Sequence, residues 1–150
     1  MDVSLDETAF IGTARHESVD CLLDAFHTSA AEGALEKYFS CFASKDARFL
    51  GTDASENWTA AEFFAFAKPH FQPLKQGGAW NYVPRKDSRK YVTTPAVDQG
   101  GHGHGGTVVT AFDEILDHAA GFGECRGSGT AVQVGGVWLL MQYHLTIGVK

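Results

Sequence analysis

The periodicity of the apolar residues changes once along this chain, between Pro69 and Trp80. Before that point apolar side chains recur every three or four residues, which is the spacing of amphipathic helices. After it they alternate or cluster in runs rich in Val, Thr, Ile and aromatic residues, which favours strands. Helices followed by consecutive strands predict an α+β fold with an antiparallel sheet.

Three helices are predicted in the first half of the chain. The first runs from about Thr13 to Ala31, and the second, which is shorter, covers Leu35 to Phe42. The third begins at Thr59 and Glu62, because these two side chains have the spacing of a capping box, and it ends near Pro69.

The second half predicts a series of antiparallel strands. They are expected over residues 80–85, 107–117, 124–133 and 137–147, and a brief strand over residues 47–50 precedes the third helix. Gly135 and Gly136 predict a tight hairpin turn between the last two. The polar segment Pro84–Lys90 is interpreted as a solvated turn, in which Arg89 is one of several surface cations.

The last strand, Val137–Ile147, carries no charged residue on either face. Counted by simple alternation, one face carries Val137, Leu139, Met141, Tyr143 and Leu145, and the other carries Trp138, Leu140, Gln142, His144 and Thr146. Antiparallel sheets usually leave one polar face in water, so we expect both faces of this strand to be covered. The helices cover one face, and a second copy of the chain covers the other. This predicts a homodimer with Leu139, Met141 and Tyr143 near its centre.

Composition excludes several classes of function. The chain has 150 residues, 44% of them hydrophobic, which is typical of one globular domain. We expect that domain to span 1–150, with its core over about 13–147. Twelve basic and eighteen acidic residues disfavour binding to nucleic acid. No apolar stretch approaches the roughly 20 residues that cross a bilayer, and the acidic start is unlike a signal peptide. We therefore expect a cytoplasmic protein without a membrane partner.

The cysteines and the paired histidines do not predict a cofactor. Cys21, Cys41 and Cys125 are far apart and odd in number, so we expect buried, reduced thiols. His102 and His104 alternate in a glycine-rich loop and could face one metal ion, but no third ligand is identifiable. We interpret that loop as a hairpin tip and expect neither a metal nor an organic cofactor.

Several segments of the chain resemble the SnoaL-like branch of the nuclear transport factor 2-like superfamily. The segments are Gly51-Thr52-Asp53, Glu56, Trp58, Phe112–Leu116, Gly123–Gly129, Val137-Trp138 and Gln142–Thr146. The resemblance covers about Val19 to Ile147. It implies a cone-shaped, strongly curved antiparallel sheet, a cystatin-like roll, with about three N-terminal helices enclosing a pocket. It also implies a homodimer through the outer face of the sheet.

The function implied by the resemblance is open between two classes. The superfamily includes ketosteroid isomerases, polyketide cyclases, dehydratases, epoxide hydrolases, transport factors and the association domain of calcium/calmodulin-dependent kinase II. One hypothesis is an isomerase, lyase or cyclase that transfers a proton on a small, largely apolar molecule with one polar or anionic group. The other is a non-catalytic homodimeric module for ligand binding or association.

Polar residues of the long strands are the candidate catalytic groups. Glu114 would act as base or acid, His144 as its partner, and Arg126 as the stabiliser of an oxyanion. The candidate ligand-binding residues are Asp53, Trp58, Ser128, Gln142, Phe39 and Leu140. The alternative is that Glu114 and Arg126 form a buried ion pair, which would leave no free base.

Overall fold

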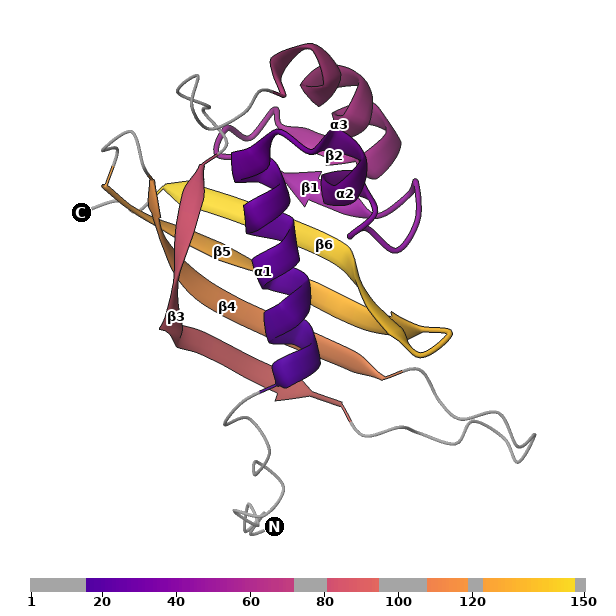
Figure 1. Ribbon diagram of the computed structural model, residues 1–150, viewed down its shortest axis with the longest axis vertical. Coiled ribbons are helices and arrows are strands. Elements are labelled where there is room, and N and C mark those ends of the chain that lie inside the picture. The colour runs from indigo at the N-terminus through magenta and orange to yellow at the C-terminus, as the bar shows by residue number, and fades with distance from the viewer. Residues whose placement is uncertain (1–15, 72–80, 95–107, 119–122, 148–150) are drawn as a thin grey trace, which may run out of the picture.

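A single α-helix crosses one face of a curved, unclosed sheet (Figure 1). The computed structural model describes residues 16–71, 81–94, 108–118 and 123–147. The crossing helix is α1 (Glu17–Glu32), and α2 (Leu35–Phe39) and α3 (Ala60–Ala67) lie at one end of the sheet. A short 3₁₀ helix, η2 (Lys68–His70), follows α3. None of the helices within these ranges is long and apolar enough to cross a membrane.

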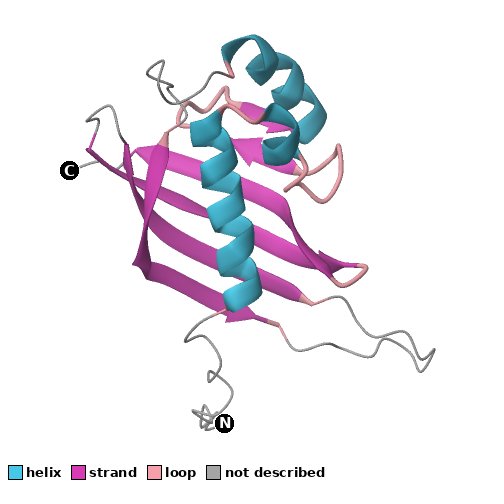
Figure 2. Ribbon diagram, viewed as in Figure 1, coloured by secondary structure: helices cyan, strands magenta, loops and turns pink. Residues whose placement is uncertain are grey.

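Six strands form one sheet in the order β2-β1-β6-β5-β4-β3 (Figure 2). They are β1 (Arg48–Leu50), β2 (Asn57–Thr59), β3 (Tyr82–Thr93), β4 (Val109–His118), β5 (Gly123–Val134) and β6 (Val137–Ile147). All neighbouring pairs are antiparallel except β1 and β6, which run parallel. The expected α+β fold is therefore confirmed, although the short strand β2 was not predicted.

Local sequence signals explain where the elements begin and end. The capping box of α3 is confirmed: the Glu62 N–H donates to the Thr59 hydroxyl at 3.1 Å, and the Thr59 N–H donates to the Glu62 carboxylate at 3.1 Å. Gly135 and Gly136 have φ angles of 54° and 82°, as a tight two-residue hairpin turn requires. β6 has the predicted bounds because this turn sets its start.

The segment predicted as a polar turn lies inside the long strand β3. Arg85 pairs with Ile115 of β4 and Lys90 pairs with Asp113, so four residues of β3 lie opposite Glu114 alone. The Ile115 N–H donates to the Ser88 hydroxyl at 2.8 Å, which replaces a regular ladder bond. The prediction of a turn is wrong because this irregularity bends the strand without reversing it.

A second irregularity, in β6, changes which side chains face the core. Thr130 of β5 pairs with Gln142 and Ala131 pairs with Leu140, so Met141 has no cross-strand partner. Beyond such a bulge the alternation of side chains is shifted by one residue. Tyr143 and Leu145 are buried, like Leu140, whereas Gln142, His144 and Thr146 are only partly buried.

The thiols differ in their surroundings. Cys41 and Cys125 are buried, as expected, but Cys21 is exposed on α1, so that part of the prediction is wrong. All three are free. Burial raises the pKa of Cys41 to about 11, so its thiol is protonated at neutral pH.

Candidate functional site

Glu114 is a fully buried carboxylate on β4, on the face that α1 covers. Its Oε1 accepts a hydrogen bond from Arg89 Nε at 3.0 Å. Its Oε2 accepts one from the Tyr143 hydroxyl at 2.7 Å and lies 2.6 Å from His27 Nε2. Both oxygens of Glu114 are therefore bound by protein groups from three other elements.

The ionisation of Glu114 sets the proton position on His27. Burial by itself would raise the pKa of Glu114, but His27, Tyr143 and Arg89 together outweigh burial and hold the pKa below 4.5. An ionised carboxylate can only accept hydrogen bonds, so His27 Nε2 must carry a proton. A charged imidazole carries protons on both nitrogens. When His27 is neutral, its lone pair lies on Nδ1, which forms no hydrogen bond with a described residue.

Arg89 supplies the positive charge that neutralises Glu114. Its side chain is 1% exposed, and its Nη1 lies 3.1 Å from an Asp20 oxygen and 2.9 Å from an Asp24 oxygen, both on α1. The Tyr91 hydroxyl donates to Asp20 as well. One buried guanidinium thus connects β3 to both β4 and α1. The interpretation of Arg89 as a surface cation is wrong, because the irregularity in β3 turns this side chain inward.

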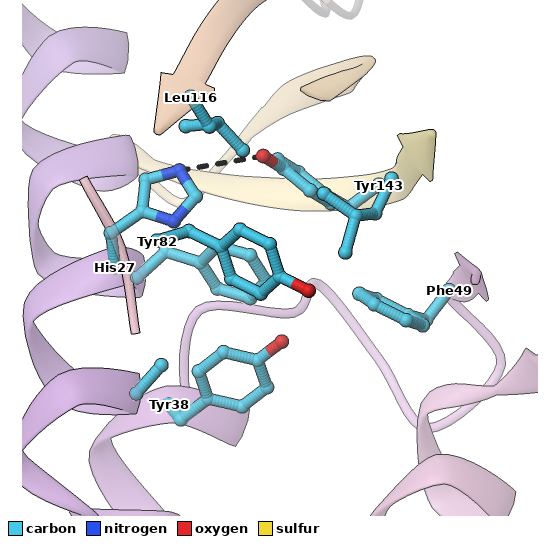
Figure 3. A pocket seen from close by; sticks show the side chains of 9 residues that line it. His27, Tyr38, Phe49, Tyr82, Leu116 and Tyr143 are labelled. Atoms are coloured by element: carbon cyan, nitrogen blue, oxygen red, sulfur yellow. Dashed lines mark hydrogen bonds between the residues drawn. The ribbon is translucent and has the colours of Figure 1, made fainter. Parts of the chain in front are cut away.

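A small cavity lies between α1 and the sheet, beside His27 and Tyr143 (Figure 3). Its volume of about 20 Å³ is room for one water-sized group. Tyr38 and Tyr82 also line this cavity, and in Figure 3 their hydroxyl ends lie on the side away from the His27 imidazole. Burial raises the pKa of Tyr82 to about 12 and that of Tyr38 well above 10, so both phenols stay protonated and can donate.

A larger cleft of about 230 Å³ adjoins this cavity. The two spaces share the wall residues Phe49, Tyr82 and Leu145. The cleft is also lined by Gly51, Thr52, Glu56, Trp58, Phe63 and Phe66. Its volume is close to the lower end of small-ligand pockets, so it can hold about one or two rings.

Near-parallel aromatic rings form one wall of the cleft. Phe49 and Phe63 stack with centroids 4.0 Å apart at 12°, and Trp58 stacks on Phe63 at 5.3 Å and 8°. Phe66 continues the stack at 4.9 Å from Trp58 and is 44% exposed. The stack makes this wall apolar, and Phe66 is its most exposed ring.

Two of the three predicted catalytic residues do not reach Glu114. Arg126 pairs in register with Ile115, on the opposite face of the sheet, where its exposed side chain lies 3.2 Å from Asp113. His144 is opposite Ser128 on that same outer face. The prediction that these residues meet inside the cone is wrong, because the bulge at Met141 moves His144 outward.

Some of the predicted ligand-binding residues lie at the cleft or in the core, and the others lie on the outer face of the sheet or in solvent. Trp58 lines the cleft. Leu140 is fully buried, and Phe39 packs on Phe63 with a centroid distance of 5.4 Å. Asp53 is exposed and accepts hydrogen bonds from the N–H and hydroxyl of Ser55. Ser128 and Gln142, like Arg126, lie on the outer face rather than at the pocket.

The groups that complete the site carry weak sequence signals. His27 lies four residues after Leu23 and three before Ala30, so its helical position predicts the buried face. Simple alternation along β6 puts Tyr143 on the outer face, and only the bulge at Met141 brings it to the inner face. Gly127 is opposite Glu114, and a Cβ there would overlap the Tyr143 hydroxyl, so glycine leaves room for that bond.

No three His, Cys, Asp or Glu side chains within the described ranges come together as a metal site. His102 and His104 lie outside the described residues. In the described part of the chain, the polar groups on Glu114 and around the cavity are an imidazole, a guanidinium and three phenols.

Comparison with known proteins agrees with the fold. A family model described as "SnoaL-like domain" matches residues 19–150. No curated protein sequence matches this chain. Among solved structures, a protein of unknown function from the DUF3225 family of Pectobacterium atrosepticum SCRI1043 has a TM-score of 0.59 at 13% identity, over 96% of this chain and 94% of that one.

Two other solved structures are similar. An NTF2-like protein of unknown function from Pseudomonas putida KT2440 has a TM-score of 0.56 at 10% identity, covering 93% of this chain and 92% of that one. A candidate calcium/calmodulin-dependent protein kinase type II association domain from Thiobacillus denitrificans ATCC 25259 has a TM-score of 0.53 at 16% identity, covering 87% and 94%. At these identities the likeness shows the fold alone.

Proposed function

The chain belongs to the SnoaL-like domain family, and on that premise we propose that it binds a small, largely apolar ring compound and transfers a proton with His27 as base. One observation carries the proposal. Ionised Glu114 holds the Nε2 proton of His27, and His27 lines a cavity that adjoins an aromatic cleft. A carboxylate that orients an imidazole in this way is a recurrent arrangement for general-base catalysis.

The reaction class follows from the groups around the cavity. Nδ1 of His27 takes a proton from carbon next to a carbonyl, and the electron pair of that C–H bond moves to the carbonyl oxygen. Tyr38 and Tyr82 line the cavity and keep their protons at neutral pH, so their phenols are the donors that we assign to the oxygen as its charge develops. The proton then returns to another carbon, as in an isomerase, or the electron pair expels a leaving group, as in a lyase.

The cavity and the cleft differ in size, so we assign a different part of the substrate to each. The inner cavity of about 20 Å³ admits only the reacting end of a molecule. The ring lies in the cleft of about 230 Å³, against Trp58 and Phe66 at the exposed end of the aromatic stack. Apolar walls supply most of the affinity, and the few polar groups set the orientation.

Deuterium exchange tests this function without knowledge of the product. Small aromatic ketones are screened by thermal shift, since a bound ligand raises the melting temperature. Those that bind are incubated with the protein in D₂O, and deuterium at the carbon next to the carbonyl is followed by NMR. We expect His27→Gln to lower the exchange rate by about 10²–10⁴, the usual contribution of a general base.

His144→Gln is the matched control, because this histidine lies on the outer face of the sheet. It should exchange deuterium at the wild-type rate. If ketones bind but wild-type protein does not accelerate exchange, the protein is a non-catalytic ligand-binding or association module. If none of the screened ketones shifts the melting temperature, the pocket proposal itself fails.

We also propose that two copies of the chain associate through the outer face of the sheet. Exposed apolar residues on that face support this proposal. Val92, Val134, Val137 and Met141 are 62, 50, 56 and 49% exposed. Several exposed apolar side chains on one face of a sheet are a feature of protein interfaces. Tyr143 is not part of that face, because it is buried against Glu114.

A further inference from the structure

Glu56 is the one charged side chain among the described residues that line the cleft. It lies in the turn between β1 and β2, where its N–H donates to the Asp53 carbonyl at 2.9 Å and its carbonyl accepts from the Gly51 N–H at 2.7 Å. These backbone bonds hold the residue at the wall of the cleft. No cationic side chain from the described part of the chain faces it there.

The carboxylate of Glu56 is anchored through one oxygen. Oε1 accepts a hydrogen bond from the Asp53 N–H at 2.9 Å and lies 3.5 Å from the Thr52 hydroxyl. The side chain folds over Gly51, where a Cβ would lie 2.8 Å from Glu56 Cβ and 2.9 Å from its Cδ. Glycine at 51 therefore permits this conformation. Oε2 forms no hydrogen bond with a described residue, so it remains as an acceptor for a ligand.

The aromatic wall complements the charge of Glu56. Trp58 and Phe66 stack at 4.9 Å, which covers the ring faces between them, and Phe66, which is 44% exposed, keeps ring surface that can attract a cation. An anionic ligand in the same cleft would face a carboxylate and negative ring faces. The expected anionic group, with Arg126 as its partner, therefore has no support in this cleft, since Arg126 lies on the outer face.

We infer that the cleft selects ring compounds that carry a protonated amine, with the ammonium group at Glu56 Oε2 and the ring against Trp58 and Phe66. This inference rests on the proposed function, whose substrate class it narrows. The ammonium end lies at the Glu56 wall, and the opposite end of the molecule faces the cavity at His27. A ring with an amine at one end and a carbonyl at the other satisfies both sites.

Three indole probes of matched size test the charge preference by isothermal titration calorimetry. Tryptamine carries an ammonium group, indole-3-propionate a carboxylate, and 3-ethylindole no charge. With wild-type protein we expect tryptamine to bind at least about tenfold more tightly than indole-3-propionate, from one ion pair and one cation–π contact. In Glu56→Gln that ratio should approach one, while the affinity for 3-ethylindole stays unchanged.

Glu36→Gln is the control for net charge, because it removes one exposed carboxylate on α2, away from the residues that line the cleft. It should keep the wild-type preference. Equal binding of tryptamine and indole-3-propionate to wild-type protein would overturn the inference and leave the ring-binding cleft intact. If none of the three probes binds, the cleft is not a ring site, and both this inference and the proposed ligand class are overturned.

Discussion

Glu114 and Asp113 are neighbours on β4, but they lie on opposite faces of the sheet and in different surroundings. Glu114 is fully buried with Arg89, whose side chain is 1% exposed. Asp113 pairs with Arg126, whose side chain is 61% exposed, at 3.2 Å. Removing one member of a buried pair leaves an uncompensated charge, whereas an exposed pair contributes little because water screens it.

Glu114→Gln should therefore destabilise the protein far more than Asp113→Asn. We expect the free energy of unfolding at pH 7 to fall by about 3–5 kcal/mol for Glu114→Gln, because Arg89 loses its one fully buried carboxylate and keeps only Asp20 and Asp24, which are partly exposed. The fall should be less than about 1 kcal/mol for Asp113→Asn. Urea unfolding of both variants measures the difference, and equal losses would contradict the buried-pair assignment.

The difference in unfolding free energy between wild type and Glu114→Gln should depend on pH. The pKa of Glu114 is lower in the folded protein than its ordinary value of 4.5. A carboxyl group with a lowered pKa stabilises the fold above its unfolded-state pKa and loses that contribution as the pH falls through the folded value. The gap between wild type and Glu114→Gln should thus be constant near neutral pH and shrink below about pH 4.5.

At the scale of elements, α3 links a local sequence signal to the cleft. Its capping box, Thr59 and Glu62, satisfies two backbone N–H groups at its start. The helix carries Phe63 and Phe66, which form part of the cleft wall. The position of this wall therefore depends on how firmly the first turn of α3 is held.

Thr59→Ala should lower the free energy of unfolding by about 1 kcal/mol, the usual cost of losing an N-cap side chain. Thr28→Ala is the matched control, since Thr28 is exposed within α1 and alanine is the better helix former. The control should be neutral or slightly stabilising in urea unfolding. A Thr59→Ala variant as stable as wild type would show that the cap is dispensable.

Strand irregularities determine which side chains reach the site. The shift between Arg85 and Lys90 brings Arg89 to Glu114, and the unpaired Met141 brings Tyr143 there. Each irregularity adds residues on one strand without a counterpart on its neighbour. Bulges of this kind bend the sheet, which is curved in this protein.

For the whole molecule, the two faces of the sheet differ in what covers them. α1 lies over the face that carries Glu114, and the opposite face exposes apolar side chains such as Val137 and Met141. This contrast supports the proposed homodimer. It also separates the proposed ligand site, on the inner side, from the proposed association surface, on the outer side.

Met141→Lys should convert the dimer into a monomer, because it buries a charge in the proposed interface. Met141 is 49% exposed in the single chain, so the substitution should leave the fold intact. Ala25→Lys, which places the same charge on the exposed side of α1, should remain dimeric. Sedimentation velocity at micromolar concentration measures this, and wild-type protein that sediments as a monomer would refute the dimer.

The sequence by itself determined the α+β class, the start of α3 and the bounds of β6. Helical and strand periodicity, the capping box at Thr59 and the Gly135-Gly136 turn act through neighbours a few residues apart, so each can be recognised locally. Glu114 was also correctly expected to be buried, because it alternates with Phe112 and Leu116 along a regular strand.

Only the tertiary structure decided which groups surround Glu114. Arg89, His27 and Tyr143 come from three elements distant in sequence, and two of them reach the site through shifts in strand pairing. A bulge is a property of two paired strands, so a single strand carries little signal for it. Because side chains alternate with a period of two, one extra residue moves every later side chain to the opposite face. That is why Tyr143, rather than His144, binds the buried carboxylate.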